Sequence, residues 1–157
     1  MTARQTGRVL ALIIPAALLG GALISQHGFG LHPCEMCYWQ RWPHEVAIGA
    51  AILGLLLGRR AAGTALAVVA AIAIIASGAI GVFHAGVEYH WWEGLTTCST
   101  LPGGGGLQAI FDAPLIRCDQ AQWTLAGISL AGFNAIFSLL GGGLVLWLLG
   151  RKQGGFA

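Results

Sequence analysis

Long uncharged apolar runs constrain the fold of this chain more than any other feature. Three runs contain no Asp, Glu, Lys or Arg, at residues 9–24, 61–83 and 123–150. A helix that crosses the hydrocarbon core of a bilayer needs about 20 mostly apolar residues. A fourth uncharged run, 46–58, is shorter. It reaches spanning length only if its helix begins near residue 38, which brings Arg41, His44 and Glu45 into the helix.

Composition agrees with a membrane protein. Only 9% of the residues are charged and 56% are hydrophobic, whereas a soluble domain carries about 25% charged residues. This excludes a disordered chain, a nucleic-acid binder and an ordinary cytosolic enzyme. We expect an all-α membrane protein, and no strands, because no stretch alternates apolar and polar residues. We predict that residues 1–157 form a single integral membrane domain, with four transmembrane helices at about 7–26, 38–59, 61–84 and 121–150, and with outer loops, expected to be periplasmic, at about 27–37 and 85–120.

The basic residues predict the orientation of these helices. Six of them fall on one side of a four-helix up-and-down arrangement: Arg4, Arg8, Arg59, Arg60, Arg151 and Lys152. Cytoplasmic segments are enriched in Lys and Arg, so this side, with both termini, is expected to be cytoplasmic. The first run also has features of a signal peptide, but cleavage there would leave the orientation of the other helices unchanged.

Two local patterns concern helix packing and helix ends. Ala73, Ser77 and Gly81 repeat every four residues, and small residues at this spacing predict close helix contact. Asp119 and Gln122 have the spacing of a capping box, which predicts that they begin the last helix.

All four cysteines lie in the two outer loops, as Cys34, Cys37, Cys98 and Cys118. The outside of a bacterial inner membrane permits disulfides. Three connectivities are open, and pairing within each loop is the first expectation. The Cys34-x-x-Cys37 spacing beside a helix N-terminus, which lowers the pKa of a thiol, is typical of a redox pair. The long-loop pair is either a structural bridge or an exchanging disulfide.

Arg41 and His84 are the next candidates for a site. Arg41 lies one helical turn after Cys37, near a helix N-terminus where a cation is disfavoured. We therefore expect Arg41 to have an anionic partner. One candidate is Glu45, in an ordinary ion pair. The other is the Cys37 thiolate together with the negative oxygen of an electron acceptor. His84 closes a long apolar run, either as an interfacial end residue or as a hydrogen-bond donor to a bound carbonyl.

These features together resemble the DsbB family of bacterial inner-membrane disulfide bond formation proteins. The resemblance rests on Pro33-Cys34-x-x-Cys37 opening the second helix, Arg41 four residues later, and the second cysteine pair in the long loop. It extends over four short segments, at residues 40–43, 84–88, 91–94 and 118–119.

The resemblance implies an enzyme, a quinone-linked oxidase that regenerates a periplasmic DsbA-like thioredoxin-fold carrier. Cys98 would form the mixed disulfide with the carrier, and Cys118 would be its partner. Electrons would then pass to Cys34 and Cys37. Cys37 would hand them to non-covalent ubiquinone or menaquinone, with Arg41, and more loosely His84, binding the quinone on the periplasmic face of the inner membrane.

Three other interpretations are weighed against this one. Vitamin K epoxide reductase-like proteins also carry two cysteine pairs, but there the C-x-x-C follows the loop pair. A metal-binding or transport protein would use the outer Cys and His residues, yet the three uncharged runs offer only hydroxyls and Asn134 as polar ligands along a path; no metal is expected. A structural subunit would keep stable bridges that turn over no quinone.

Overall fold

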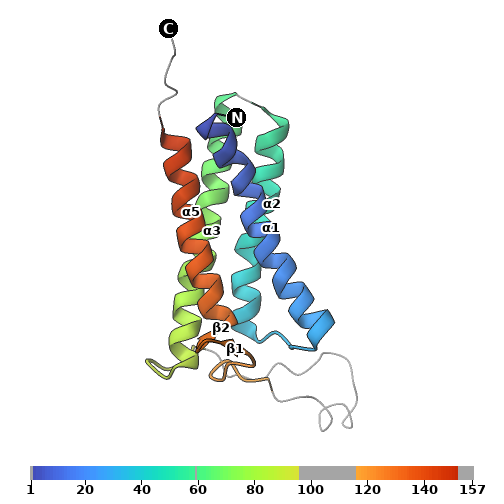
Figure 1. Ribbon diagram of the computed structural model, residues 1–157, viewed down its shortest axis with the longest axis vertical. Coiled ribbons are helices and arrows are strands. Elements are labelled where there is room, and N and C mark those ends of the chain that lie inside the picture. Colours follow the sequence, from blue (N-terminus) through green and yellow to red (C-terminus); the bar gives the residue numbers. More distant parts are fainter. Residues whose placement is uncertain (1, 59, 96–115, 152–157) are drawn as a thin grey trace.

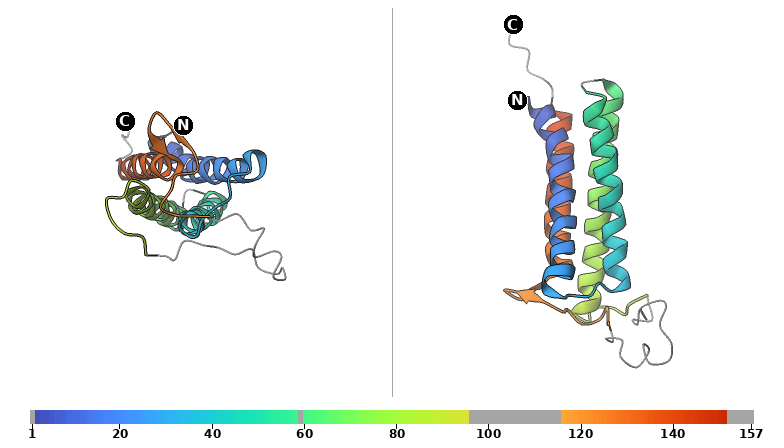
Figure 2. Two further views of the ribbon diagram at one scale, coloured as in Figure 1. Left: turned by 90° about the horizontal axis from the view of Figure 1, so that it is seen from below. Right: turned by 90° about the vertical axis from the view of Figure 1, so that its right-hand side faces the viewer.

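The computed structural model describes residues 2–58, 60–95 and 116–151, and these form a bundle of four helices with a small hairpin at one end (Figure 1). The helices are α1 (Ala3–Phe29), α2 (Glu35–Leu56), α3 (Ala61–Glu88) and α5 (Leu130–Gly150), and the hairpin strands are β1 (Thr124–Leu125) and β2 (Ile128–Ser129). In Figure 2, α1 and α5 form one layer of the bundle and α2 and α3 form the other.

Three of the described helices, α1, α3 and α5, are long and apolar enough to cross a membrane. This confirms three of the four expected spans. Helix α2 has 22 residues but includes Glu35, Arg41 and Glu45, so its role as the fourth span stays a prediction. It packs against α1 and α3 inside the same bundle.

Helix α2 begins earlier than the sequence predicted. Cys34 is its N-cap residue with an extended backbone, and the Cys34 carbonyl accepts hydrogen bonds from the backbone N–H groups of Cys37, at 3.1 Å, and Tyr38, at 3.3 Å. Cys37 therefore lies in the first turn of the helix rather than before it. Both sulfurs are consequently attached to rigid backbone at one helix end.

Helix α5 begins at Leu130, nine residues later than expected, because a β-hairpin precedes it. Ala126 and Gly127 both have positive φ, at 52° and 78°, as two-residue hairpin turns require. The expectation of no strands was therefore wrong. The expected capping box was wrong too, since Ser129 caps α5 by accepting from Gly132 N at 3.1 Å.

The two residues of the supposed capping box have other partners. Asp119 accepts two hydrogen bonds from Arg117, at 2.9 and 2.5 Å, and this guanidinium lowers the pKa of the carboxyl. Gln122 donates to the backbone carbonyl of His32 in the short outer loop. Both contacts fix the segment that carries Cys118, rather than a helix start.

Small residues allow the helices to approach closely, as predicted. Ser77 is fully buried, and a Cβ added at Gly81 would lie 3.0 Å from both Ala131 O and Ala135 N of α5. Ala73 packs against the main apolar core. That core is built largely from alanine, and its buried members are Ala11, Ala47, Ala50, Ala51, Ala67, Ala70, Ala71, Ile74, Val145 and Leu149.

Arg8 closes the other end of the bundle. It is only 7% exposed and donates to the carbonyl oxygens of Gly58 and Arg60 and, at 2.6 Å, to Thr64 Oγ1. It therefore holds the turn between α2 and α3 in place. This structural role is separate from the predicted role of its positive charge in setting the orientation in the membrane. The described basic residues Arg4, Arg8, Arg60 and Arg151 share this end, opposite the hairpin, while Arg59 and Lys152 lie outside the described residues.

Candidate redox site

The structure brings one cysteine from each outer loop into a single buried cluster. Cys34 is 3% exposed and Cys118 is 1% exposed, and both pack with Met36 and Val87. Cys34 is held as the N-cap of α2, while Cys118 lies in the segment that leads to the hairpin. Residues 84 positions apart in the chain thus share one sulfur site.

Cys34 lies at the centre of this cluster. Its Sγ is 3.2 Å from Cys37 Sγ, as the donor of a hydrogen bond, and it is also hydrogen-bonded to the Cys118 thiol. The two thiol neighbours, Cys118 first, together with burial, raise the pKa of Cys34 well above its ordinary value. At Cys34, the two neighbouring thiols and burial therefore outweigh the lowering of the thiol pKa that a helix N-terminus gives.

Cys98 lies outside the described residues. Its pairing with Cys118 and its attack by a carrier therefore stay predictions. Of the predicted catalytic residues, the structure places Cys34, Cys37 and Cys118 together.

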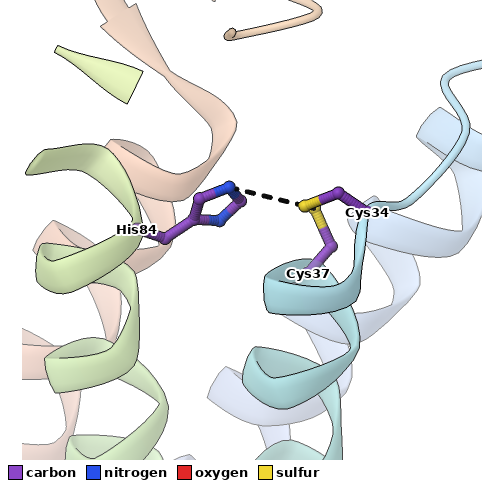
Figure 3. Close-up of side chains that lie close together, drawn as sticks. All are labelled: Cys34, Cys37 and His84. Atoms are coloured by element: carbon purple, nitrogen blue, oxygen red, sulfur yellow. Dashed lines mark hydrogen bonds between the residues drawn. The ribbon is translucent and has the colours of Figure 1, made fainter. Parts of the chain in front are cut away.

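His84 faces the cysteines from α3, as Figure 3 shows. Its ring is 2% exposed, with Nε2 3.5 Å from Cys34 Sγ and 3.7 Å from Glu88 Oε1. The ring is also hydrogen-bonded to the backbone of Cys118. His84 therefore contacts both segments of the sulfur cluster, which makes it more than an interfacial end residue.

Cys34, Cys37 and His84 also have the grouping of a metal site, with their ligand atoms all within 4.8 Å of one another. The hydrogen bonding of the imidazole argues against that use. A metal-ligating histidine donates its other ring N–H to an acceptor, whereas His84 Nδ1 lies 2.7 Å from the amide nitrogen of Gln40, which is a donor. This ring nitrogen therefore faces a donor, not the acceptor that a metal-ligating histidine needs there.

Arg41 is anchored to α1. It donates to Gln26 Oε1 at 2.5 Å and to Ala22 O at 3.4 Å, and its guanidinium lies 5.3 Å from the centre of the Tyr38 ring. Of the two anionic partners considered, Glu45 forms no ion pair with Arg41 in the described part of the chain, because the contact with Gln26 and Ala22 holds the guanidinium toward α1. From there its charge acts on Cys37.

A cavity of about 300 Å³ lies beside the cluster, lined by residues of all four described helices as well as the outer segments. Its wall is mostly apolar, with Leu18, Phe133 and Phe137 among the lining residues. Polar groups enter from Cys37, Arg41, His44 and His84. A mainly apolar pocket with a few convergent polar groups suits a lipophilic ring with polar oxygens.

Sequence reasoning missed the polar network below the cysteines. Buried polar side chains from α2, α3 and α5 join in it, namely Gln40, His44, Ser77, Asn134 and Ser138. The available signal was the presence of amide and imidazole groups within helices predicted to cross a membrane, where polar groups mark functional positions. Asn134 was noticed in the sequence only as a rare polar residue of the last run.

Comparison with known proteins gives one consistent family. The model of the family described as "Disulfide bond formation protein DsbB" matches residues 4–148. Proteins named disulfide bond formation protein B are similar to this chain in Verminephrobacter eiseniae, 35% identical with 94% of this chain and 88% of the relative covered, and in Aromatoleum aromaticum, 29% identical with 89% of both covered. A relative of the same name in Acidovorax sp. is 31% identical, with 92% of this chain and 87% of the relative covered. No solved structure matches.

Proposed function

The chain belongs to the DsbB family of membrane disulfide bond formation proteins, and from this premise we propose that it is a quinone-dependent protein-thiol oxidase. Its substrate is a periplasmic DsbA-like carrier with a thioredoxin fold. Electrons pass from the carrier to Cys98 and Cys118, then to Cys34 and Cys37, and finally to a membrane quinone.

The position of Cys34 is the observation that supports this relay best. It touches Cys37 in its own loop and Cys118 of the other loop. Thiol–disulfide exchange requires an attacking sulfur in contact with the sulfur it attacks. A pair of isolated structural bridges has no need for such contact, so the arrangement favours transfer between the loops.

Each exchange step forms one disulfide bond and breaks another. A carrier thiolate attacks Cys98, the Cys98–Cys118 bond breaks, and Cys118 leaves as a thiolate. Cys118 then attacks Cys34, the Cys34–Cys37 bond breaks, and Cys37 leaves as a thiolate. The second carrier thiolate attacks the mixed disulfide and frees Cys98 as a thiolate, and the carrier is released oxidised.

Cys98 then attacks Cys118, which restores the Cys98–Cys118 bond. Cys34 leaves in this step, so that Cys34 and Cys37 now form a dithiol that holds the two electrons.

The apolar cavity beside Cys37 fits a quinone headgroup, and Arg41 and His44 would hold it. Bound quinone would accept the two electrons and two protons of the Cys34–Cys37 dithiol, which thereby becomes a disulfide again. Arg41 supplies a fixed positive charge beside Cys37, where it stabilises a thiolate. His44 donates through Nε2 to Asn134 Oδ1, so its buried Nδ1, which has no hydrogen-bond partner among the described residues, is an acceptor and would bond a hydroxyl of the reduced quinone.

We place the protein in the bacterial inner membrane as a multi-pass protein with α2 as the fourth span. The sulfur cluster then faces the periplasm and the Arg8 end faces the cytoplasm. The oxidising compartment and the cysteines fall on the same side in this orientation, as a thiol oxidase requires.

A trapping experiment tests the carrier step. In a Cys118→Ala variant, Cys98 attacks the disulfide of an oxidised DsbA-like carrier, one carrier sulfur leaves as a thiolate, and a mixed disulfide remains that Cys118 can no longer resolve. We expect this complex on non-reducing gels, and we expect it to disappear in Cys98→Ala/Cys118→Ala. A complex that survives in the double variant, or none in the single variant, would refute the proposed polarity.

A further inference from the structure

A series of side-chain amides donates toward His84, from Asn134 to Gln40 and from Gln40 to the imidazole ring. We propose that His84 donates its Nε2–H to Cys34 Sγ, and that Gln40 and Asn134 are positioning residues that keep the imidazole in this tautomer. The redox role of this hydrogen bond rests on the thiol oxidase function proposed above. The hydrogen-bond geometry itself does not depend on that function.

The direction is set by backbone carbonyls, which can only accept. The Gln40 amide nitrogen lies 3.2 Å from Met36 O, so this end of the amide carries the hydrogens. The same nitrogen lies 2.7 Å from His84 Nδ1. Gln40 therefore donates to Nδ1, which must hold a lone pair, and the ring proton of the neutral imidazole resides on Nε2.

Asn134 fixes the Gln40 amide from the other side. Its Nδ2 lies 2.8 Å from Gln40 Oε1 and 3.2 Å from Ser77 O, a second carbonyl that can only accept. Its Oδ1 accepts from His44 Nε2 at 2.9 Å and from Ser138 Oγ at 3.0 Å. Turning the Gln40 amide over would set two oxygens together at Met36 and two nitrogens together at Asn134.

The result is an N–H that faces a buried sulfur and is shared with the backbone of Cys118, to which the ring is also hydrogen-bonded. His84 Nε2 lies 3.5 Å from Cys34 Sγ, with both residues at most 3% exposed. Reduction of the Cys34–Cys37 disulfide breaks the S–S bond and adds two electrons and, where one sulfur stays a thiolate, one proton, so that the reduced pair carries one negative charge. A preorganised donor in a dry site stabilises that charge, so it makes the disulfide easier to reduce.

Nitrogen NMR of the ring tests the tautomer directly. In protein labelled with ¹⁵N-histidine in detergent, we expect His84 to show a protonated Nε2 and an unprotonated Nδ1, with His84→Gln used to assign the signals. In Gln40→Glu, the carboxylate accepts rather than donates, so the proton should move to Nδ1. An Nδ1–H tautomer in the wild-type protein would overturn the proposal.

Thiol–disulfide equilibrium with dithiothreitol tests the consequence. The dithiothreitol dithiol is oxidised to its cyclic disulfide as the Cys34–Cys37 disulfide is reduced, and Cys98→Ala/Cys118→Ala protein isolates this pair. We expect Gln40→Glu to lower the equilibrium constant for reduction about tenfold, the size of one charged hydrogen bond, while Gln5→Glu at the opposite end leaves it unchanged. An unchanged constant in Gln40→Glu, with the tautomer switched, would also overturn the proposal.

Asn134→Ala gives a second route if Gln40→Glu does not fold. Without the Asn134 donor, only the Met36 carbonyl still orients the Gln40 amide, so we expect a fraction of His84 to appear in the Nδ1–H form; a single unchanged Nε2–H form would contradict the role of Asn134. Neither measurement uses quinone or carrier. A failure of the proposed oxidase function would therefore leave these results unchanged, and a failure of the tautomer assignment would leave the oxidase function unchanged.

Discussion

At the residue scale, the chemistry of the site depends on the surroundings of Cys34. Two neighbouring thiols and burial raise its pKa, because they favour the protonated form over a desolvated thiolate. From the sequence, the four cysteines and Arg41 were predicted to form one outer site, and the structure brings Cys34, Cys37 and Cys118 together. The sequence could not predict the partners, because contact between Cys34 and Cys118 depends on how two loops fold over the bundle.

The raised pKa of Cys34 predicts its alkylation behaviour. At a given pH a raised pKa leaves less thiolate, so labelling of Cys34 by iodoacetamide in the reduced protein should have its midpoint above pH ~8.5, the ordinary thiol value. Cys118→Ala removes the largest cause of the shift and should move the midpoint down. Mass spectrometry of the labelled peptide measures this, and comparing midpoints rather than rates separates acidity from access. A midpoint at or below the ordinary value in the wild type would contradict the assignment.

Arg41 is expected to serve the quinone rather than the carrier. Arg41→Ala should raise the KM for quinone about tenfold or more, the scale of losing a charged contact, and leave the KM for the reduced carrier within about twofold. Gln26→Leu removes the partner that holds Arg41 at 2.5 Å and should give a smaller effect in the same direction. Steady-state kinetics in detergent measure both KM values. An equal rise in the KM for quinone and the KM for the reduced carrier would contradict this role.

At the element scale, the helices could be predicted from apolar runs, whereas their ends could not. The structure starts α2 at Glu35 and α5 at Leu130. Cys34 caps α2 with its backbone and no side-chain hydrogen bond, so no capping residue marked the start. The hairpin before α5 pairs only two residues in each strand, which is too short for an alternating pattern to appear.

The turn between α2 and α3 gives a packing prediction. A Cβ at Gly63 would lie 2.6 Å from Gly54 O and closer still to Gly58 O. Gly63→Ala should therefore destabilise the bundle by about 1–3 kcal/mol, as overpacking against backbone does. Gly49→Ala on α2 meets nothing within 4 Å and should be neutral or stabilising by about 0.5–1 kcal/mol. Thermal unfolding in detergent compares the two, and equal melting temperatures would contradict the close helix contact.

At the scale of the whole molecule, the charge pattern and the cysteine pattern agree on one polarity. Described basic residues such as Arg8 and Arg60 lie at one end of the bundle, and Cys34, Cys118 and His84 lie at the other. This separation could be predicted from the sequence because it follows from the order of apolar runs. The buried clamp of Arg8 and the network at Gln40 could not, because each depends on side chains from several helices meeting in the interior.

The central claim is that electrons from a protein dithiol leave through a quinone. The most direct test is anaerobic absorbance of ubiquinone or menaquinone after reduced DsbA-like carrier is mixed with the purified protein in detergent. The account predicts loss of one oxidised quinone per carrier dithiol, and no loss in Cys37→Ser or Cys98→Ser. Carrier oxidation without loss of quinone, or quinone loss that persists in Cys37→Ser, would contradict it.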